Sequence, residues 1–198
     1  MNLRGPKVRI SRQLGIPLTP KAQKHLDRRP GTPGQHGLNQ RPGKMSNYKR
    51  QLMEKQRLRA QYNVGERQLR NYFEEASRRG GNVGAALLQL LETRIDALVL
   101  RAGYARTIFA ARQLVVHGHV KLNGRRVSFP SHAVKPGDQV ALTAKAREIP
   151  QVVMAMEATR APSYLELAGD GARLRELPEA TQIPVTCQLP LVVEFYSR

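Results

Sequence analysis

One stretch, TIFAARQLVVHGHVKLNGRRV at residues 107–127, constrains the fold more than any other part of the chain. Its first half predicts a helix that Thr107 caps and Gly118 ends, because apolar residues recur there at the spacing of one helix face. The inward-facing residues of this helix are expected to be Ala110, Ala111, Leu114 and Val115. The chain must then leave the helix at once and enter a different kind of element.

The second half of the stretch predicts a two-residue β-hairpin. Asn123-Gly124 suits the two positive-φ positions of such a turn, and apolar residues alternate on either side of it. Pro136-Gly137-Asp138 predicts a second turn, and residues 140–142 predict a strand that returns to the sheet. This part of the chain should therefore combine helices with a short antiparallel sheet.

The residues before this stretch predict a small helical domain. Ser46 is placed to cap a first helix, and Asn63 with Glu66 resembles the cap of a second helix that ends at Gly80-Gly81. Asn82 would open a third helix, and residues 95–102 would form another amphipathic turn or two.

Residues 1–45 are expected to form a basic, extended N-terminal arm. The segment is rich in Pro and Gly and has no sustained apolar period, so it should not build a core of its own. Its PGQHG turn, at residues 33–37, would bring backbone and His36 close to a phosphate or a base. A disordered solubilising tail is the alternative interpretation of the same composition.

The formal net charge of +18 indicates a polyanionic partner. Residues 1–60 carry 15 basic and 2 acidic side chains, and residues 102–147 carry 8 and 1, whereas residues 148–198 carry 4 and 7. Charge concentrated in zones favours nucleic-acid binding over an evenly solvated surface. An anionic membrane is the main rival, but no stretch pairs a basic face with a broad apolar face, and we expect no membrane contact.

The sequence carries no motif of an enzyme, since HExxH, GxSxG and a phosphate loop ending in Gly-Lys-Ser/Thr are all missing. His117 and His119 have no Asp or Cys partners at ligand spacing, so we expect no metal. Without an enzyme motif, we also expect no cofactor and no small-molecule substrate. The single cysteine, Cys187, and a start without an apolar signal segment favour a cytoplasmic location.

The residues ARQLVVHGHVKLNGRRV, followed by VKPGD, resemble the RNA-binding module named after small ribosomal subunit protein four. Pseudouridine synthases and some tRNA synthetases share this module, so the rest of the chain decides. Also similar to the bacterial ribosomal family itself are GPK at residues 5–7, PGQHG, residues 54–76 and 82–105, and the terminal VEFYSR. The chain is identified as a member of that family, in a variant without the N-terminal cysteine cluster that binds zinc in many members.

The resemblance implies a structural constituent of the ribosome, which binds small-subunit ribosomal RNA early and nucleates assembly of the subunit body. It also implies contact with other small-subunit proteins, and with small ribosomal subunit protein five in particular, through which the family influences translational accuracy. In the family the RNA-binding module is an insertion, and the C-terminal segment returns to the first helical domain. We therefore expect an α+β protein with an arm at 1–45, a helical domain at 46–92 plus 156–198, and an RNA-binding domain at 93–155.

The RNA-binding residues are expected in the arm, on the first two helices, and around the helix and hairpin of the module. The helix face and the hairpin tip should form one positive concavity that recognises the shape and phosphates of folded RNA. The candidates are Arg4, Lys7, Arg9, Gln35, His36, Lys44, Tyr48, Lys49, Lys55, Arg57, Arg59, Arg67, Arg70, Arg106, Thr107, Arg112, Gln113, His117, Lys121, Asn123, Arg125 and Arg126.

Two other functions fit the same residues. An RNA-binding factor outside the mature ribosome, such as a paralogue acting in assembly, stress or regulation, is left open by the missing cysteines and by non-consensus positions such as Leu38 and Phe109. Non-specific compaction of DNA would also use the positive charge, although the chain has no recognisable DNA-reading motif.

Overall fold

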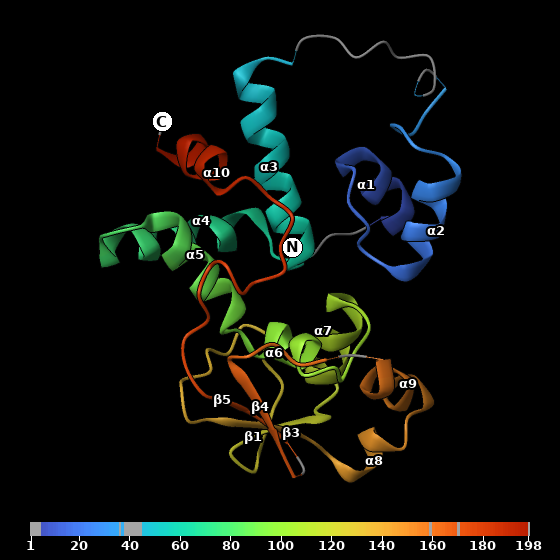
Figure 1. Ribbon diagram of the computed structural model, residues 1–198, viewed down its shortest axis with the longest axis vertical. Helices are drawn as coiled ribbons and strands as arrows, with labels where there is room; N and C mark the ends of the chain where they lie inside the picture. The colour runs from blue at the N-terminus through green and yellow to red at the C-terminus, as the bar shows by residue number, and fades with distance from the viewer. Residues whose placement is uncertain (1–4, 36, 38–44, 159, 170, 198) are drawn as a thin grey trace. The chain divides into compact units, whose positions relative to one another are not determined.

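The computed structural model describes residues 5–35, 37, 45–158, 160–169 and 171–197, and it confirms the α+β class (Figure 1). The chain divides into two compact units, one of Met1–Gly84 with Val185–Arg198 and the other of Ala85–Pro184. The second unit is thus an insertion within the first. No helix in the described part of the chain is long and apolar enough to cross a membrane.

The first unit is helical. Ser46 caps its longest helix, as predicted, by accepting a hydrogen bond from the Lys49 amide at 3.3 Å. The cap predicted at Asn63 is wrong, because Asn63 adopts a left-handed conformation (φ 48°) and the next helix begins after Gly65 without a side-chain cap. The helices are α1 (Lys7–Leu14), α2 (Pro20–Arg28), α3 (Asn47–Gln61), α4 (Glu66–Arg79) and, from the end of the chain, α10 (Leu189–Tyr196).

The N-terminal arm differs from the expected extended segment, since residues 7–28 contain α1 and α2. Leu14, Ile16, Leu18 and Ala22 are buried there, with exposed fractions between 0% and 8%. These few apolar residues are shared between two short helices and the loop that joins them. Because the apolar residues do not recur at a helical spacing through the whole segment, their pattern did not predict the two helices.

Lys55 of α3 lies at the contact that α10 makes with the rest of the first unit. Its ammonium lies 2.7 Å from a carboxylate oxygen of Glu66 and 4.2 Å from the centroid of the Phe195 ring. The Tyr196 hydroxyl donates a hydrogen bond to the same carboxylate at 2.9 Å. Burial alone would raise the pKa of Glu66, but these bonds and the charge of Lys55 outweigh it and leave the pKa below its ordinary value.

The second unit packs helices against a five-stranded antiparallel sheet of order β2-β1-β3-β5-β4. Its core joins residues of the helices, such as Val99 and Val115, to strand residues such as Val120 and Leu142. Its helices are α6 (Ile95–Arg101), α7 (Ile108–Val116), α8 (Ala144–Arg147) and α9 (Pro150–Ala158), and α5 (Val83–Glu92) leads into it. Its strands are β1 (Val120–Leu122), β2 (Arg125–Val127), β3 (Gln139–Leu142), β4 (Leu165–Ala168) and β5 (Gly171–Leu174).

The last two strands are the main difference from the expected domain limits. The sequence placed residues 156–198 with the helical domain, whereas β5 pairs with β3 and β4 pairs with β5. Residues 165–174 therefore belong to the sheet, and only Val185–Arg198 return to the first unit. Each of these strands is four residues long, which is too short for a reliable alternation of apolar and polar residues.

The hairpin between β1 and β2 forms as predicted. Asn123 and Gly124 have φ angles of 49° and 81°, and Val120 lies opposite Val127 in the ladder. The Asn123 side chain also accepts a hydrogen bond from the Gln139 amide at 2.9 Å and donates one to Asp138 at 2.8 Å. These bonds attach the hairpin tip to the turn that precedes β3.

Replacing Glu66 with glutamine should reduce the pH dependence of stability. A carboxylate whose pKa is lowered by folding stabilises the protein above the unfolded-state pKa, and this contribution is lost as the pH falls through the folded-state pKa. In urea titrations between about pH 6 and pH 3, the unaltered protein should lose unfolding free energy more steeply than Glu66→Gln. Glu75→Gln, which removes an exposed α4 carboxylate paired with Arg79, should keep the original slope, and equal slopes for all three proteins would contradict the assignment.

Replacing Gly124 with valine should destabilise the second unit by about 1–2 kcal/mol, because a branched side chain is strained at positive φ. A Cβ at Gly124 would meet nothing within 4 Å, so the penalty comes from the backbone alone. Gly124→Asn is the matched control, since asparagine tolerates this conformation. Thermal unfolding followed by circular dichroism measures the difference, and identical melting of the two variants would argue against the assigned turn.

Candidate nucleic-acid interface

The helix α7 presents a polar face above a buried apolar one, as the sequence predicted. The Thr107 hydroxyl accepts a hydrogen bond from the Ala110 amide at 3.2 Å and so caps the helix. Ala111 and Val115 are fully buried, whereas Gln113 is exposed. The cap and the apolar face together set the direction in which the polar side chains point.

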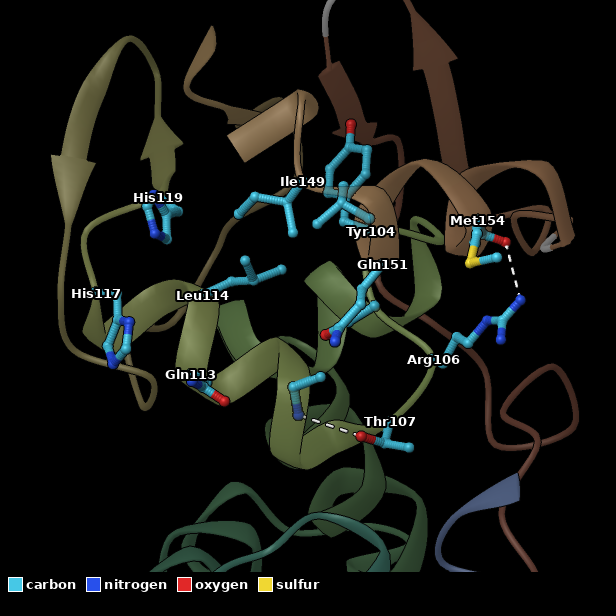
Figure 2. Close-up of a pocket in the computed structure, with 13 residues that line it drawn as sticks. Tyr104, Arg106, Thr107, Gln113, Leu114, His117, His119, Ile149, Gln151 and Met154 are labelled. Carbon is cyan, nitrogen blue, oxygen red and sulfur yellow. Dashed lines mark hydrogen bonds between the residues drawn. The ribbon is translucent and has the colours of Figure 1, made fainter. Parts of the chain in front are cut away.

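The outer face of α7 forms one wall of a groove with a volume of about 450 Å³ (Figure 2). Four of the predicted RNA-binding residues, Arg106, Thr107, Gln113 and His117, line it together. The other wall comes from residues 149–154, at the start of α9. This wall was not predicted from the sequence, because PQVVMAMEA contains no basic residue that would mark it.

The hairpin residues lie elsewhere in the second unit. Lys121 lines another hollow, of about 610 Å³, together with Gln139 and Arg147. Arg125 and Arg126 are exposed on β2. The described residues therefore distribute the predicted positive charge over separate places, rather than over the single concavity that the sequence predicted.

Arg112 is held by a buried carboxylate. Its guanidinium lies 3.5 Å from Asp96, which also accepts two hydrogen bonds from Arg94 at 2.9 and 2.6 Å. Asp96 and Arg94 are almost wholly buried, with exposed fractions of 0% and 1%, and the Arg112 side chain is 20% exposed. A charge shared with a buried partner is less available to an RNA phosphate than that of an exposed arginine.

A second buried carboxylate, Glu92, connects helices to the sheet. The Tyr164 hydroxyl donates a hydrogen bond to it at 2.7 Å, and Arg101 forms an ion pair with it. Burial, followed by the nearby charge of Glu92, raises the pKa of Tyr164. Because Tyr164 directly precedes β4, this contact helps to explain why the last two strands stay with the second unit.

Three predicted RNA-binding residues of α3 make contacts inside the first unit. Lys55 is 5% exposed and pairs with Glu66, and Arg59 lies 3.1 Å from the same carboxylate. Arg57 donates a hydrogen bond to the Leu14 carbonyl at 2.8 Å and pairs with Glu54. Lys55 is therefore not among the proposed RNA contacts, since its buried ammonium would have to give up its bond to Glu66 to reach a phosphate.

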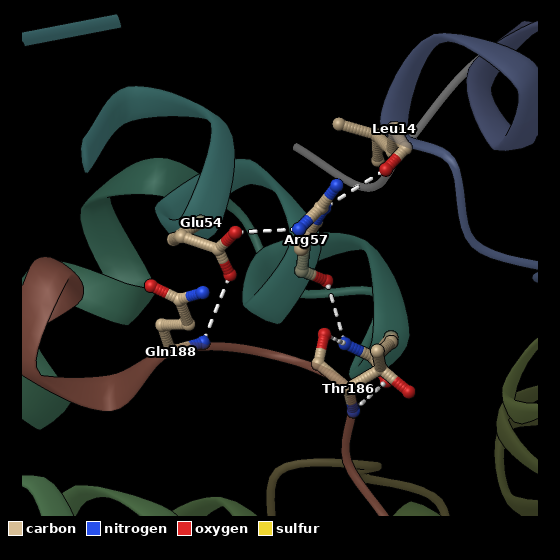
Figure 3. A network of polar contacts seen from close by, with 6 residues as sticks. Leu14, Glu54, Arg57, Thr186 and Gln188 are labelled. Carbon is tan, nitrogen blue, oxygen red and sulfur yellow. Dashed lines mark hydrogen bonds and ion pairs between the residues drawn. The ribbon is translucent and has the colours of Figure 1, made fainter. Parts of the chain in front are cut away.

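Arg57 belongs to a polar network that connects three distant parts of the sequence (Figure 3). The Glu54 carboxylate, which pairs with Arg57, also accepts a hydrogen bond from the Gln188 amide at 2.9 Å. Gln61 accepts one from the Thr186 amide at 2.9 Å and donates one to the Thr186 carbonyl at 3.1 Å. The network attaches both α1 and the returning C-terminal segment to α3.

The other predicted residues of the first unit lie at its surface. Arg70 pairs with Glu74 at 3.3 Å, and both side chains are at least half exposed. Residues Lys7, Arg9, Gln35, Tyr48, Lys49 and Arg67 are exposed or half-buried. Arg4, His36 and Lys44 lie outside the described residues. In the part of the chain that is described, no three His, Cys, Asp or Glu side chains lie close enough together to hold a metal ion.

Comparisons with known proteins cover nearly all of the chain. The model of the Ribosomal protein S4/S9 N-terminal domain matches residues 2–92, and the model of the S4 domain matches residues 93–140. Small ribosomal subunit protein uS4 of Micrococcus luteus is 49% identical over 199 residues, which cover 96% of this chain and 95% of that protein. The uS4 protein of Streptomyces avermitilis is 49% identical over 200 residues, which cover 98% and 97%.

The similarity extends over both compact units and over almost the full length of each relative. The aligned residues include those of the second unit, which the structure of this chain shows to be inserted within the first. The chain therefore belongs to the S4 family of ribosomal proteins.

Proposed function

We propose that this chain is a structural constituent of the small ribosomal subunit and binds its ribosomal RNA, and that it is not an enzyme. The observation that carries the proposal is the identity of about one residue in two, along the whole chain, with proteins named small ribosomal subunit protein uS4. The net charge of +18 supports it, because cationic side chains gain affinity for RNA by releasing counterions from the phosphates.

The RNA contacts that we propose fall into three groups. In the second unit they are the groove residues beside α7 and the exposed hairpin arginines. In the first unit they are the exposed polar and basic side chains of the arm and of α3 and α4. A site of this kind recognises the shape and phosphates of folded RNA more than it stacks bases along a single strand, since only 5% of the residues are Phe, Trp or Tyr.

The proposal extends to the role of the protein in the subunit. We propose that it binds ribosomal RNA early, nucleates assembly of the subunit body in the cytoplasm, and contacts other small-subunit proteins. Small ribosomal subunit protein five is the partner through which it would contribute to translational accuracy. The acidic last quarter of the chain, with seven acidic and four basic side chains in residues 148–198, supports a protein partner there, because its net negative charge does not attract RNA phosphates.

The decisive experiment compares nucleic acids at about 0.3 M salt, where non-specific binding is weak. Purified protein is mixed with labelled small-subunit ribosomal RNA and an excess of transfer RNA or duplex DNA, and retention on a filter is measured. Selective retention of the ribosomal RNA is expected. Loss of the ribosomal RNA from the filter in the presence of either competitor would refute the proposal, and absence of the protein from purified small subunits would favour a factor outside the ribosome.

Replacing Arg125 with glutamine should weaken ribosomal RNA binding and reduce the salt dependence of the affinity. Loss of one phosphate contact lowers the slope of log K against log salt by roughly 0.7–0.9. Arg175→Gln, at an exposed position after β5, is the matched control and should keep the original slope. Identical slopes for both variants and the unaltered protein would show that Arg125 does not contact phosphate.

A further inference from the structure

The groove between α7 and α9 has an apolar middle. Leu114 of α7 and Val152 of α9 line it and are 9% and 3% exposed, and Ala110 and Ile149 also line it. A volume of about 450 Å³ falls within the range of sites that hold small organic groups. Phosphates alone would not need such a surface, because a phosphate contact requires only charge and hydrogen-bond donors.

Polar side chains surround this apolar middle. Gln113 projects from α7 and Gln151 from the opposite wall, and each amide can both donate and accept a hydrogen bond. Within the part of the chain that the structure describes, neither amide side chain makes a hydrogen bond. The edge of a nucleobase offers donors and acceptors side by side, which is the pattern that two such amides can satisfy.

Two aromatic rings and one arginine complete the groove. The imidazole rings of His117 and His119 lie at one end, with centroids 6.2 Å apart and planes tilted by 54°. Arg106 lies at the other end, and its guanidinium makes a long 3.5 Å contact with the Met154 carbonyl. Imidazole rings can stack on a base, and a guanidinium can bind the phosphate attached to it.

The charge around the groove distinguishes between two possible occupants, a nucleobase attached to a phosphate and an apolar side chain of a protein. None of the described residues that line it is acidic, although the chain as a whole contains 15 acidic residues. Residues 102–147, which supply the α7 wall, carry eight basic side chains and one acidic side chain. This surrounding charge favours an apolar, aromatic group that is attached to an anion over an apolar side chain of a protein.

We propose that the groove binds one unpaired base of the ribosomal RNA, and that α9 is therefore part of the RNA-binding surface. The base lies between the α7 and α9 walls, Gln113 and Gln151 bind its edge, and Arg106 binds its phosphate. This inference rests on the proposed function, and it adds direct recognition of a base to the recognition of shape and phosphates. It also assigns a role to residues 149–154, which the pattern of basic residues did not mark.

The test fills the groove with an added aromatic side chain and measures the chemical protection of individual RNA bases. The protein, its Ala110→Phe variant and its Val116→Phe variant are bound to small-subunit ribosomal RNA. Val116 lies on the same helix, is 52% exposed and does not line the groove, so it controls for the added ring. Unpaired bases are probed with dimethyl sulfate and a carbodiimide, and the RNA backbone is probed with hydroxyl radicals.

At least one unpaired base should be protected by the unaltered protein and by Val116→Phe, but not by Ala110→Phe. Backbone protection should persist in all three complexes, and Ala110→Phe should bind roughly tenfold more weakly, as expected for the loss of one stacked base. Circular dichroism shows whether each variant folds. If Ala110→Phe does not fold, the double variant Gln113→Ala/Gln151→Ala takes its place and should lose the same protection.

The possible failures are distinguishable. Selective RNA binding without any protected base, or with the same protected bases in every variant, would overturn the base site and leave the proposed function intact. Weakening that appears only after other small-subunit proteins are added would assign the groove to a protein and would also overturn the base site. Failure of the unaltered protein to bind ribosomal RNA selectively would overturn both proposals.

Discussion

The buried carboxylate of Asp96 constrains how the helices of the second unit pack. An unpaired buried charge would be strongly destabilising, but Asp96 accepts bidentate bonds from Arg94 and a hydrogen bond from the Ala97 amide, and it lies 3.5 Å from Arg112. Arg94 comes immediately before α6 and Arg112 lies on α7, and the shared carboxylate therefore connects the two helices. The position of α7 in turn decides where the groove lies and which polar side chains line it.

The first unit depends on a comparable arrangement at Lys55. The ammonium is shared between the Glu66 carboxylate and the face of Phe195, so α3, the start of α4 and α10 meet at one charge. The Arg57 network adds the end of α1 to the same helix. Two basic side chains that composition alone would assign to RNA thus stabilise the fold, and the net charge of the chain overstates the charge that is available to a phosphate backbone.

Some basic residues of this chain stabilise the fold, and others remain for the proposed RNA surface. Arg125 and Arg126 of the hairpin are exposed to solvent, whereas Arg112 forms an ion pair with the buried Asp96. The groove beside α7 combines little net charge with apolar walls and two amides. A protein built in this way can gain affinity from phosphates at one place and selectivity from a base at another.

The sequence by itself determined the features that depend on near neighbours, namely the caps at Ser46 and Thr107 and the Asn123-Gly124 turn. The net charge and the motifs along the whole chain also indicated a polyanionic partner and the family. Tertiary structure decided which charges are used internally, that β4 and β5 join the sheet, that α1 and α2 form in the arm, and that α9 supplies a groove wall. The physical reason is distance along the chain. Glu54 accepts from Gln188, and Glu92 from Tyr164, across 134 and 72 residues, and such pairs leave no periodic signal in the sequence.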